Sequence, residues 1–300
     1  MTTVSMLTRY HEVVREASRP RFMGADLASK ITAAEALGSP CRLCERSCGS
    51  DRWEGEKGSC GVLEPLVTSD FIHFGEEPEL VPSHTVFFAG CNFRCAFCQN
   101  WDISQQPECG AAEAPATLAD RIMRGGGINV NWVGGDPTPN LPFVLKVMAE
   151  LKENDIGLAQ IWNSNMYMSK EAMNILDGTI DLYLSDFKYG NDRCAKRLSG
   201  VDRYFEIVGR NHLRAASQCE ILLRHLVLPG HIDCCTRPVL DWVASNIPKN
   251  ILRVNVMDQY HPDFMVLRDG AKYGELSRRL RPGEYLEAFE YARKLGLDIV

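Results

Sequence analysis

Hydrophobic residues along most of this chain fall in short runs that alternate with longer amphipathic stretches. From residue 84 onward, each apolar run is followed by a segment whose apolar positions recur three and four residues apart, the spacing of one helix face. The runs therefore predict strands and the segments predict helices. The predicted strands are 85–88, 128–133, 157–162, 182–185, 220–227 and 252–256, and the predicted helical segments are 118–124, 141–152, 170–176, 195–216, 238–246 and 282–295.

Regular alternation of apolar strands and helices is typical of a parallel sheet whose two faces are both covered. The six strand–helix units are fewer than the eight of a complete barrel. We therefore predict an α/β fold with a partial (β/α)6 TIM-type barrel. An open, doubly wound sheet is the alternative.

The first 83 residues follow a different pattern. Residues 4–17 are amphipathic, and residues 26–37 are Ala-rich and precede Gly38-Ser39-Pro40, so both predict helices. Residues 40–82 show little periodicity and hold several cysteines among Gly, Glu and Pro, which indicates a loop region organised by a ligand. We expect an N-terminal helical segment (1–39), a Cys-rich loop region with an auxiliary metal site (40–83), and the barrel domain (84–300).

Composition narrows the class of protein. Apolar residues make up 45% of the chain and charged residues 24%, which favours a large core over disorder. The net charge of −6 gives no reason to expect a nucleic-acid or membrane partner. No apolar run approaches the roughly 20 residues of a membrane span, and the first 20 residues lack the apolar centre of a signal peptide. We expect a soluble, cytoplasmic protein.

Twelve cysteines are unusual for such a protein. In a reducing compartment, clustered cysteines indicate metal binding instead of disulfides. Seven of them form two groups: Cys41, Cys44, Cys48 and Cys60, and then Cys91, Cys95 and Cys98. The remaining five look scattered, and we interpret them as thiols without a ligand role: Cys109, Cys194, Cys219, Cys234 and Cys235.

The second cysteine group has the spacing C-x3-C-x2-C and directly follows the predicted strand 85–88. Three thiolates are one too few for a closed [4Fe–4S] site. A cluster held by Cys91, Cys95 and Cys98 keeps one iron open for a substrate or cofactor, as an open zinc site binds water. In parallel α/β folds, active sites form at the carboxyl ends of strands. A structural zinc loop completed by a distant His or Cys is the alternative.

The pattern Cys-x3-Cys-x-aromatic-Cys, with Phe97 as the aromatic residue, resembles the signature of the radical S-adenosylmethionine (SAM) superfamily. The stretch 87–100 resembles the pyruvate formate-lyase activating enzyme branch, and looks closest to a group named pyruvate formate-lyase activating enzyme-like proteins. The resemblance covers about residues 40–300, with 84–300 as the radical SAM domain. It implies a [4Fe–4S] cluster and SAM as cofactors, with Phe97 in the cofactor site.

The resemblance also implies a reaction. In the family, SAM binds the open iron through its amino and carboxylate groups, and one electron from the cluster cleaves the sulfonium bond. This yields methionine and a 5′-deoxyadenosyl radical that abstracts hydrogen, while the protein orients the cofactor. The implied substrate is a protein or peptide, such as a glycyl radical enzyme, and the implied electron donor is external, such as ferredoxin or flavodoxin. Radical modification of a peptide or small molecule, and a non-catalytic metal-binding protein, are the alternatives.

The strand 128–133 leads into Gly134-Gly135-Asp136, which resembles the family's Gly-Gly-Glu motif with Asp in place of Glu. Two glycines let the backbone approach a ligand closely, and a carboxylate or carbonyl there can accept a hydrogen bond from the SAM ammonium. The Asp136 side chain is one methylene shorter than Glu, which puts direct contact in question. A Gly-Gly turn capped by Asp136 is the other interpretation.

Polar residues also follow the next two strands. Asn163 and Asn165 follow strand 157–162 and can hydrogen-bond the ribose or methionyl part of SAM, or cap the next helix. Asp186 and Lys188 follow strand 182–185 and lie on one side of an extended chain. They resemble the family's Asp-x-Lys pattern, in which the lysine meets the SAM carboxylate. An ordinary ion pair is the alternative.

The last candidates are Arg224 and His261. Period two places Arg224 on the strand face opposite His225, and the strand resembles the family's Arg-containing strand that ends in Pro-Gly, which implies an inward charge near SAM. His261 lies in a segment that resembles the family's Tyr-His segment without its preceding Leu-Pro, which implies a contact with SAM or adenine. A turn histidine is the alternative.

The first cysteine group, Cys41-x2-Cys44-x3-Cys48-x11-Cys60, offers four thiols, enough for a closed site. A second iron–sulfur cluster and a zinc ion fit equally well by ligand count, and unligated thiols are a third interpretation. Because this group is close in sequence to the second one, a second cluster here would suit an electron relay.

Overall fold

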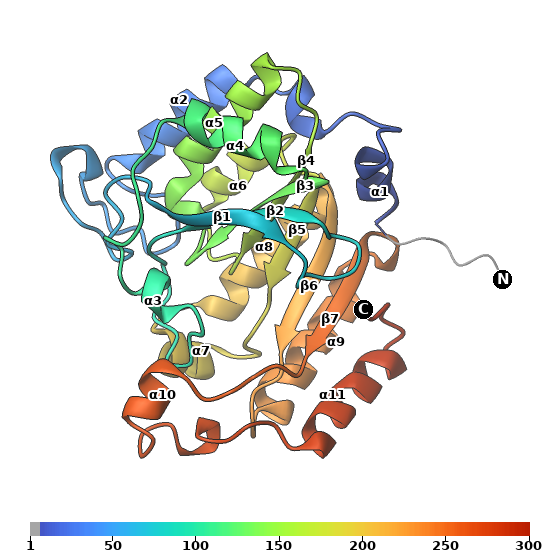
Figure 1. The fold of residues 1–300 in the computed structure, drawn as a ribbon. Coiled ribbons are helices and arrows are strands. Elements are labelled where there is room, and N and C mark those ends of the chain that lie inside the picture. The colour runs from blue at the N-terminus through green and yellow to red at the C-terminus, as the bar shows by residue number, and fades with distance from the viewer. Residues whose placement is uncertain (1–6) are drawn as a thin grey trace.

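The computed structural model describes residues 7–300, so residues 4–6 of the first predicted helix lie outside the described part. A seven-stranded sheet follows the order of the sequence; its first strand is antiparallel to the second, and all later neighbours are parallel (Figure 1). The strands are β1 (Val67–His73), β2 (Ser83–Phe88), β3 (Asn129–Gly134), β4 (Ala159–Ser164), β5 (Leu182–Asp186), β6 (Glu220–Leu226) and β7 (Leu252–Met257).

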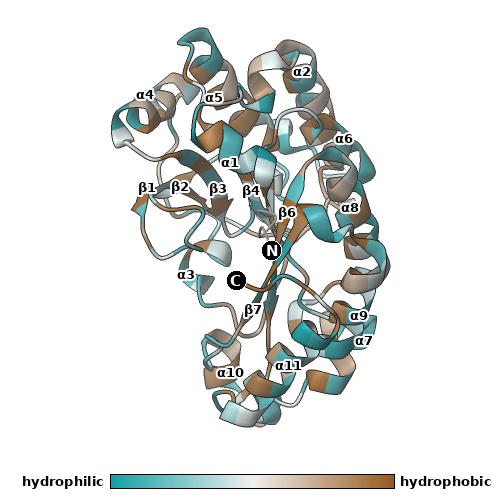
Figure 2. Ribbon diagram, turned by 90° about the vertical axis from the view of Figure 1, so that its right-hand side faces the viewer, coloured by the Kyte–Doolittle hydropathy of each residue, from teal (hydrophilic) through white to brown (hydrophobic). Residues whose placement is uncertain are grey.

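Six consecutive parallel strands confirm the predicted partial (β/α)6 barrel. A doubly wound sheet would reverse its strand order at a switch point, and this sheet does not. Helices lie around the outside of the sheet and at its two ends (Figure 2). They are α1 (Thr8–Val14), α2 (Leu27–Gly38), α3 (Trp101–Ser104), α4 (Pro115–Gly125), α5 (Leu141–Glu153), α6 (Lys170–Leu176), α7 (Asp192–Ser199), α8 (Tyr204–Gln218), α9 (Arg237–Asn246), α10 (Phe264–Arg268) and α11 (Pro282–Lys294).

The predicted helical stretch 195–216 is two helices, α7 and α8. The break falls at Gly200, whose φ of 66° is left-handed and ends α7. Arg203, also left-handed, begins α8. The sequence pattern did not reveal this break because apolar residues continue on both sides of it.

The description of residues 40–82 as loop was wrong in part. Val67–His73 forms β1, which pairs antiparallel with β2 across six residue pairs from Val67↔Phe88 to His73↔Ser83. As an edge strand, β1 has mostly partly exposed residues and lacks a continuous apolar run. That is why its sequence does not look like the buried strands.

The loop between β1 and β2, residues 74–82, crosses the open side of the barrel to β6 and β7. Glu79 forms an ion pair with Arg253 of β7, and Glu76 and Glu77 form ion pairs with Arg224 of β6. The C-terminal residues lie along the free edge of β7, where the Val254 N–H donates to the Asp298 oxygen at 2.8 Å. The split barrel is therefore spanned by charge pairs in place of further strands.

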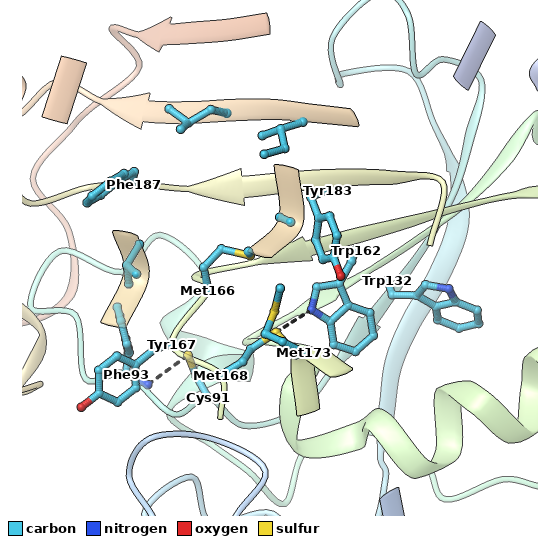
Figure 3. Packing of buried hydrophobic residues seen from close by; sticks show 14 of the residues in the cluster. Cys91, Phe93, Trp132, Trp162, Met166, Tyr167, Met168, Met173, Tyr183 and Phe187 are labelled. Atoms are coloured by element: carbon cyan, nitrogen blue, oxygen red, sulfur yellow. Dashed lines mark hydrogen bonds between the residues drawn. The ribbon is translucent and has the colours of Figure 1, made fainter. Parts of the chain in front are cut away.

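Large side chains fill the layer between the strands and the helices. Trp132, Trp162 and Tyr183 occupy paired positions on β3, β4 and β5 and are fully buried (Figure 3). The indole N–H of Trp162 donates to the Met168 sulfur at 3.3 Å. The indole N–H of Trp132 donates to the Gln160 side-chain oxygen at 2.8 Å, so both buried indole nitrogens have a hydrogen-bond partner.

The short helix α1 closes the amino end of the barrel. Tyr10 packs with Leu7, Val13 and inward residues of β4, β5 and β6 in a small core of its own. Its hydroxyl accepts a hydrogen bond from the Asn129 amide at 2.8 Å, and its backbone N–H donates to Glu220 at 2.8 Å. Since Asn129 and Glu220 begin β3 and β6, α1 is fastened to the end opposite the strand carboxyl ends.

Replacing Tyr10 tests this closure. Tyr10→Ala should lower the free energy of unfolding by about 3 kcal/mol, because it opens a cavity in a fully buried site. Tyr10→Phe should cost only about 1 kcal/mol, because the Asn129 amide keeps its second acceptor, the Leu80 oxygen. Urea unfolding of both variants beside the surface change Leu213→Ala, expected within about 0.5 kcal/mol of wild type, measures this. Equal values for all three variants would contradict the closure.

Candidate active site

The carboxyl ends of the parallel strands surround a cavity of about 650 Å³. Most residues predicted for the site line this one cavity. They are Cys91, Cys95, Phe97, Cys98, Gly134, Gly135, Asp136, Asn163, Asn165, Asp186, Lys188 and Arg224. His261 is not among the lining residues; its Nδ1 lies 3.2 Å from the Pro262 oxygen, and the neighbouring Gln259 lines the cavity instead.

Each thiol of the Cys91–Cys98 loop has a hydrogen-bond partner. The Phe93 N–H donates to the Cys91 sulfur at 3.3 Å, a contact drawn in Figure 3. The Cys95 sulfur lies 3.0 Å from the Ser199 hydroxyl, and the Cys98 sulfur lies 3.1 Å from the Ser104 hydroxyl. Donors directed at thiolate sulfur stabilise its negative charge and tune a bound iron–sulfur cluster.

Burial sets the protonation of these thiols. It raises the pKa of Cys91 well above its usual value, and nearby Asp136 and Cys95 add to the effect. Burial also raises the pKa of Cys95 to about 12 and the pKa of Cys98, while Lys188 opposes both shifts. Without a metal these thiols are neutral near pH 7. A metal must displace their protons, so its binding is coupled to proton release.

The two glycines after β3 allow a close backbone approach. A Cβ on Gly134, whose φ is 109°, would lie 2.1 Å from the Phe88 nitrogen. A Cβ on Gly135 would lie 2.0 Å from the Gly90 oxygen. The Gly135 N–H donates to the Phe88 oxygen at 2.9 Å. The glycines thus hold the end of β3 against the chain that leads into Cys91.

The Asp136 carboxylate accepts hydrogen bonds from neighbouring groups of the protein. One oxygen accepts from the Thr138 N–H at 3.0 Å. The other accepts from the Ser164 hydroxyl at 3.0 Å and from the Asn165 N–H at 2.9 Å. Burial raises the pKa of Asp136, and these hydrogen bonds oppose the rise. Asp136 therefore joins the ends of β3 and β4, which agrees with the capping interpretation of this residue.

The two asparagines after β4 differ in their surroundings. The Asn165 amide nitrogen donates to the Asn92 side-chain oxygen at 2.6 Å and lies 3.9 Å from the Cys91 sulfur. Its side-chain oxygen accepts from the Tyr167 N–H at 3.0 Å. Asn165 thus braces the cysteine loop, while Asn163 lines the cavity and remains the better candidate for a ligand contact.

Lys188 places a positive charge among the thiols. Its ammonium group forms an ion pair with Asp186, and both residues line the cavity. Burial disfavours the charge on Lys188, but the nearby Asp186 carboxylate outweighs it and raises the pKa of Lys188. The lysine is therefore charged and can bind a carboxylate that enters the cavity.

Arg224 lines the cavity, but its charge is already compensated. Its Nε donates to Glu77 at 2.8 Å, and its Nη2 pairs with both Glu76 and Glu77. Glu77 also accepts from the Asn255 amide at 2.8 Å. Because two glutamates face one arginine, this part of the cavity wall carries a net negative charge.

Sequence reasoning missed the wall of the cavity formed by the β1–β2 loop and by β7. It also missed Ser104 and Ser199 beside the cysteine sulfurs. The alternation on β7 was the one available signal, because Asn255 and Met257 share a strand face. The missed lining residues on this side of the cavity are His73, Gly75, Glu76, Glu77, Pro78, Asn255, Met257, Gln259 and Val300.

Comparison with known proteins agrees with this geometry. The sequence profile of the Radical SAM superfamily matches residues 85–243, more than half of the chain. The chain belongs to the radical SAM superfamily. An uncharacterized protein of Methanocaldococcus jannaschii is 43% identical over 279 residues, which cover 90% of this chain and 79% of that relative.

More distant matches cover only part of the matched proteins. The pyruvate formate-lyase-activating enzyme of Staphylococcus aureus is 27% identical over 164 residues, which cover 50% of this chain and 63% of that enzyme. Streptococcus suis SuiB bound to the precursor peptide SuiA aligns with a TM-score of 0.46 at 14% identity, over 70% of this chain and 46% of SuiB. This radical SAM enzyme is thus a distant homologue of the activating enzyme.

The family implies a [4Fe–4S] cluster and SAM, and the residues of this radical SAM chain fit both. Three thiols, each with a hydrogen-bond partner, leave the fourth ligand position of a cubane open. The cavity beside them falls within the roughly 300–1,000 Å³ of small-molecule sites. Lys188 supplies a cation for a carboxylate.

Among the described residues, no helix is long and apolar enough to cross a membrane.

The first cysteine group of this radical SAM enzyme is also assembled in space. The Cys41 N–H donates to the Ser50 oxygen at 2.9 Å, and a Cβ on Gly58, two residues before Cys60, would lie 2.6 Å from the Cys48 sulfur. Burial raises the pKa of Cys44 to about 12, and the other three thiols add to that rise. A Cβ on Gly90 would lie 3.1 Å from the Cys60 backbone oxygen. The two cysteine loops are therefore in contact.

Replacing Gly135 tests the role of the close approach at the cluster loop. Gly135→Ala should displace the chain before Cys91, because a Cβ cannot lie 2.0 Å from an oxygen. We expect loss of most of the roughly four irons of the cluster at Cys91, Cys95 and Cys98 after anaerobic reconstitution. Gly24→Ala is the matched control, because a Cβ there has no atom within 4 Å. Full iron content in Gly135→Ala would contradict this account.

Proposed function

We propose that this chain cleaves SAM reductively at a cluster bound by Cys91, Cys95 and Cys98 and abstracts hydrogen from a protein or peptide partner. The observation that carries the proposal is the cavity in which three thiols, a charged lysine and a glycine-lined strand end meet. Residues 84–300 would serve as the catalytic domain. An external donor such as ferredoxin or flavodoxin would supply the electron.

When bound, the cluster and SAM supply a 5′-deoxyadenosyl radical, and the protein supplies binding and orientation. The Lys188 ammonium would bind the SAM carboxylate, with Asp186 holding the lysine in place. Backbone groups of Gly134 and Gly135 would lie against the SAM amino group. Asn163 would hydrogen-bond the ribose or methionyl part.

Two features support a protein or peptide partner. The relative from Staphylococcus aureus is named for activating another enzyme, pyruvate formate-lyase. In this chain, Phe71 and Phe74 of the β1–β2 segment are 44% and 72% exposed, and His73 between them lines the cavity. Phe71 packs edge-on against the His73 ring. Exposed aromatic side chains at a cavity rim suit contact with a chain segment that reaches inward.

Anaerobic turnover tests the chemistry. Reconstituted protein given dithionite and SAM should release 5′-deoxyadenosine, and Cys95→Ala should release none because the cluster loses a ligand. Cys219→Ala is the control, since Cys219 is buried outside both cysteine groups and should leave turnover intact. Absence of 5′-deoxyadenosine from the wild type would overturn the proposal. Appearance of a glycyl radical signal by electron paramagnetic resonance, after incubation with candidate partner proteins, tests the activating role separately.

We further propose that Cys41, Cys44, Cys48 and Cys60 hold a second iron–sulfur cluster that relays electrons to the first. Contact between the two cysteine loops supports the relay, because electrons would have a short path. Arg52 is buried and lowers the pKa of both Cys41 and Cys60, although burial prevails there. Zinc remains the competing metal for the same four thiols.

Metal content separates the two metals. The double variant Cys44→Ala/Cys48→Ala should retain about four of roughly eight irons per chain if the group holds a cluster. Iron and sulfide should fall together, measured after anaerobic purification. Unchanged iron and sulfide with the loss of one zinc would establish zinc and remove the relay.

A further inference from the structure

Three of the five cysteines interpreted as scattered thiols lie together. The sulfur atoms of Cys194, Cys234 and Cys235 are all within 4.8 Å of one another. The Cys194 and Cys234 sulfurs are 3.9 Å apart, as are those of Cys234 and Cys235. Among the described residues, this is the one group of three or more such side chains whose ligand atoms gather so closely.

Two local structures create this group. Cys194 lies in the first turn of α7. Cys234 and Cys235 lie in a single turn of π-helix, Ile232–Thr236, just before α9. Single π-turns are rare and occur frequently at functional sites. The segments are 40 residues apart in sequence, so neither predicts the other.

Asn191 joins the two segments and directs a donor at the sulfurs. Its side-chain oxygen accepts from the Cys194 N–H at 2.8 Å and so caps α7. Its amide nitrogen donates to the Cys234 oxygen at 2.7 Å and lies 3.4 Å from the Cys194 sulfur and 3.9 Å from the Cys235 sulfur. An amide fixed in this way supports thiolate ligands as an outer-shell group of a metal site does.

The sulfur spacing matches a metal. Zinc–sulfur bonds of about 2.3 Å in tetrahedral geometry place sulfurs about 3.8 Å apart. Both measured spacings are 3.9 Å. We propose that Cys194, Cys234 and Cys235 bind a zinc ion, whose fourth position is open to water or another ligand on the side of the partly exposed Cys234. On binding, zinc takes the place of the thiol protons, which pass to solvent.

A disulfide is the competing use of these thiols. It would join two sulfurs at about 2.05 Å and leave the third unpaired. Three sulfur atoms lie around one point, and an amide donor lies near two of them. This arrangement suits one metal ion shared by three thiolates better than a disulfide between two of them. All three cysteines are free thiols in the structure.

Zinc content of the full-length protein tests the site. Wild type prepared anaerobically should hold about one more zinc ion per chain than Cys194→Ser or Cys235→Ser, at equal iron content. Cys219→Ser is the matched control, because Cys219 is buried and outside the group, and it should keep the zinc. The result is the difference in zinc content between wild type and each variant, so any zinc bound by the Cys41–Cys60 group cancels. Equal zinc in wild type and both variants would overturn the proposal.

A second measurement needs no variant. Zinc added to chelator-treated wild type should slow alkylation of the partly exposed Cys234 by about tenfold or more, because a metal-bound thiolate is shielded. Cys109, which is also partly exposed but outside the group, should react at the same rate with and without zinc. Unchanged alkylation of Cys234, or a Cys194–Cys234 disulfide in the anaerobic protein, would overturn the site. Neither result depends on SAM cleavage.

Discussion

Because β2 to β7 pair in parallel and in register, six strand ends open at one edge of the sheet. Phe88 pairs with Gly134, Ser164 with Ser185, and Asp186 with Arg224, so the residues after each strand come to the same depth. Side chains from segments more than 100 residues apart are thereby placed around one cavity. The rest of the site depends on this constraint, since no single loop holds more than a few of its groups.

This constraint also explains which predictions succeeded. The parallel strands and the C-x3-C-x2-C loop have local signatures, so pattern and spacing reveal them. Gly134, Asn163 and Lys188 each follow a recognisable predicted strand, which is why their position at the cavity could be predicted, while their contacts with SAM stay predictions. Their convergence then follows from the parallel order.

Features that depend on tertiary contacts could not be predicted. The edge strand β1 lacks a buried face, and the ion pairs from Glu77 and Glu79 of the β1–β2 loop to β6 and β7 join residues far apart in sequence. Ser199 carries no motif, yet its hydroxyl lies against the Cys95 sulfur. Arg224 was expected as an inward charge near SAM, and its two glutamate partners come from a segment that was predicted to be loop.

The short helix α7 connects these observations. Its last carbonyls need partners, and the cysteine loop provides them: the Arg94 N–H donates to the Ser199 oxygen at 3.0 Å and the Ala96 N–H to the Leu198 oxygen at 2.7 Å. Its first turn carries Cys194. One helix of about two turns therefore fixes Cys95 at one end and the Cys194 group at the other. A shift of α7 must move both, so a ligand bound at Cys194 would stiffen the support of the Cys91–Cys98 loop without entering the cavity.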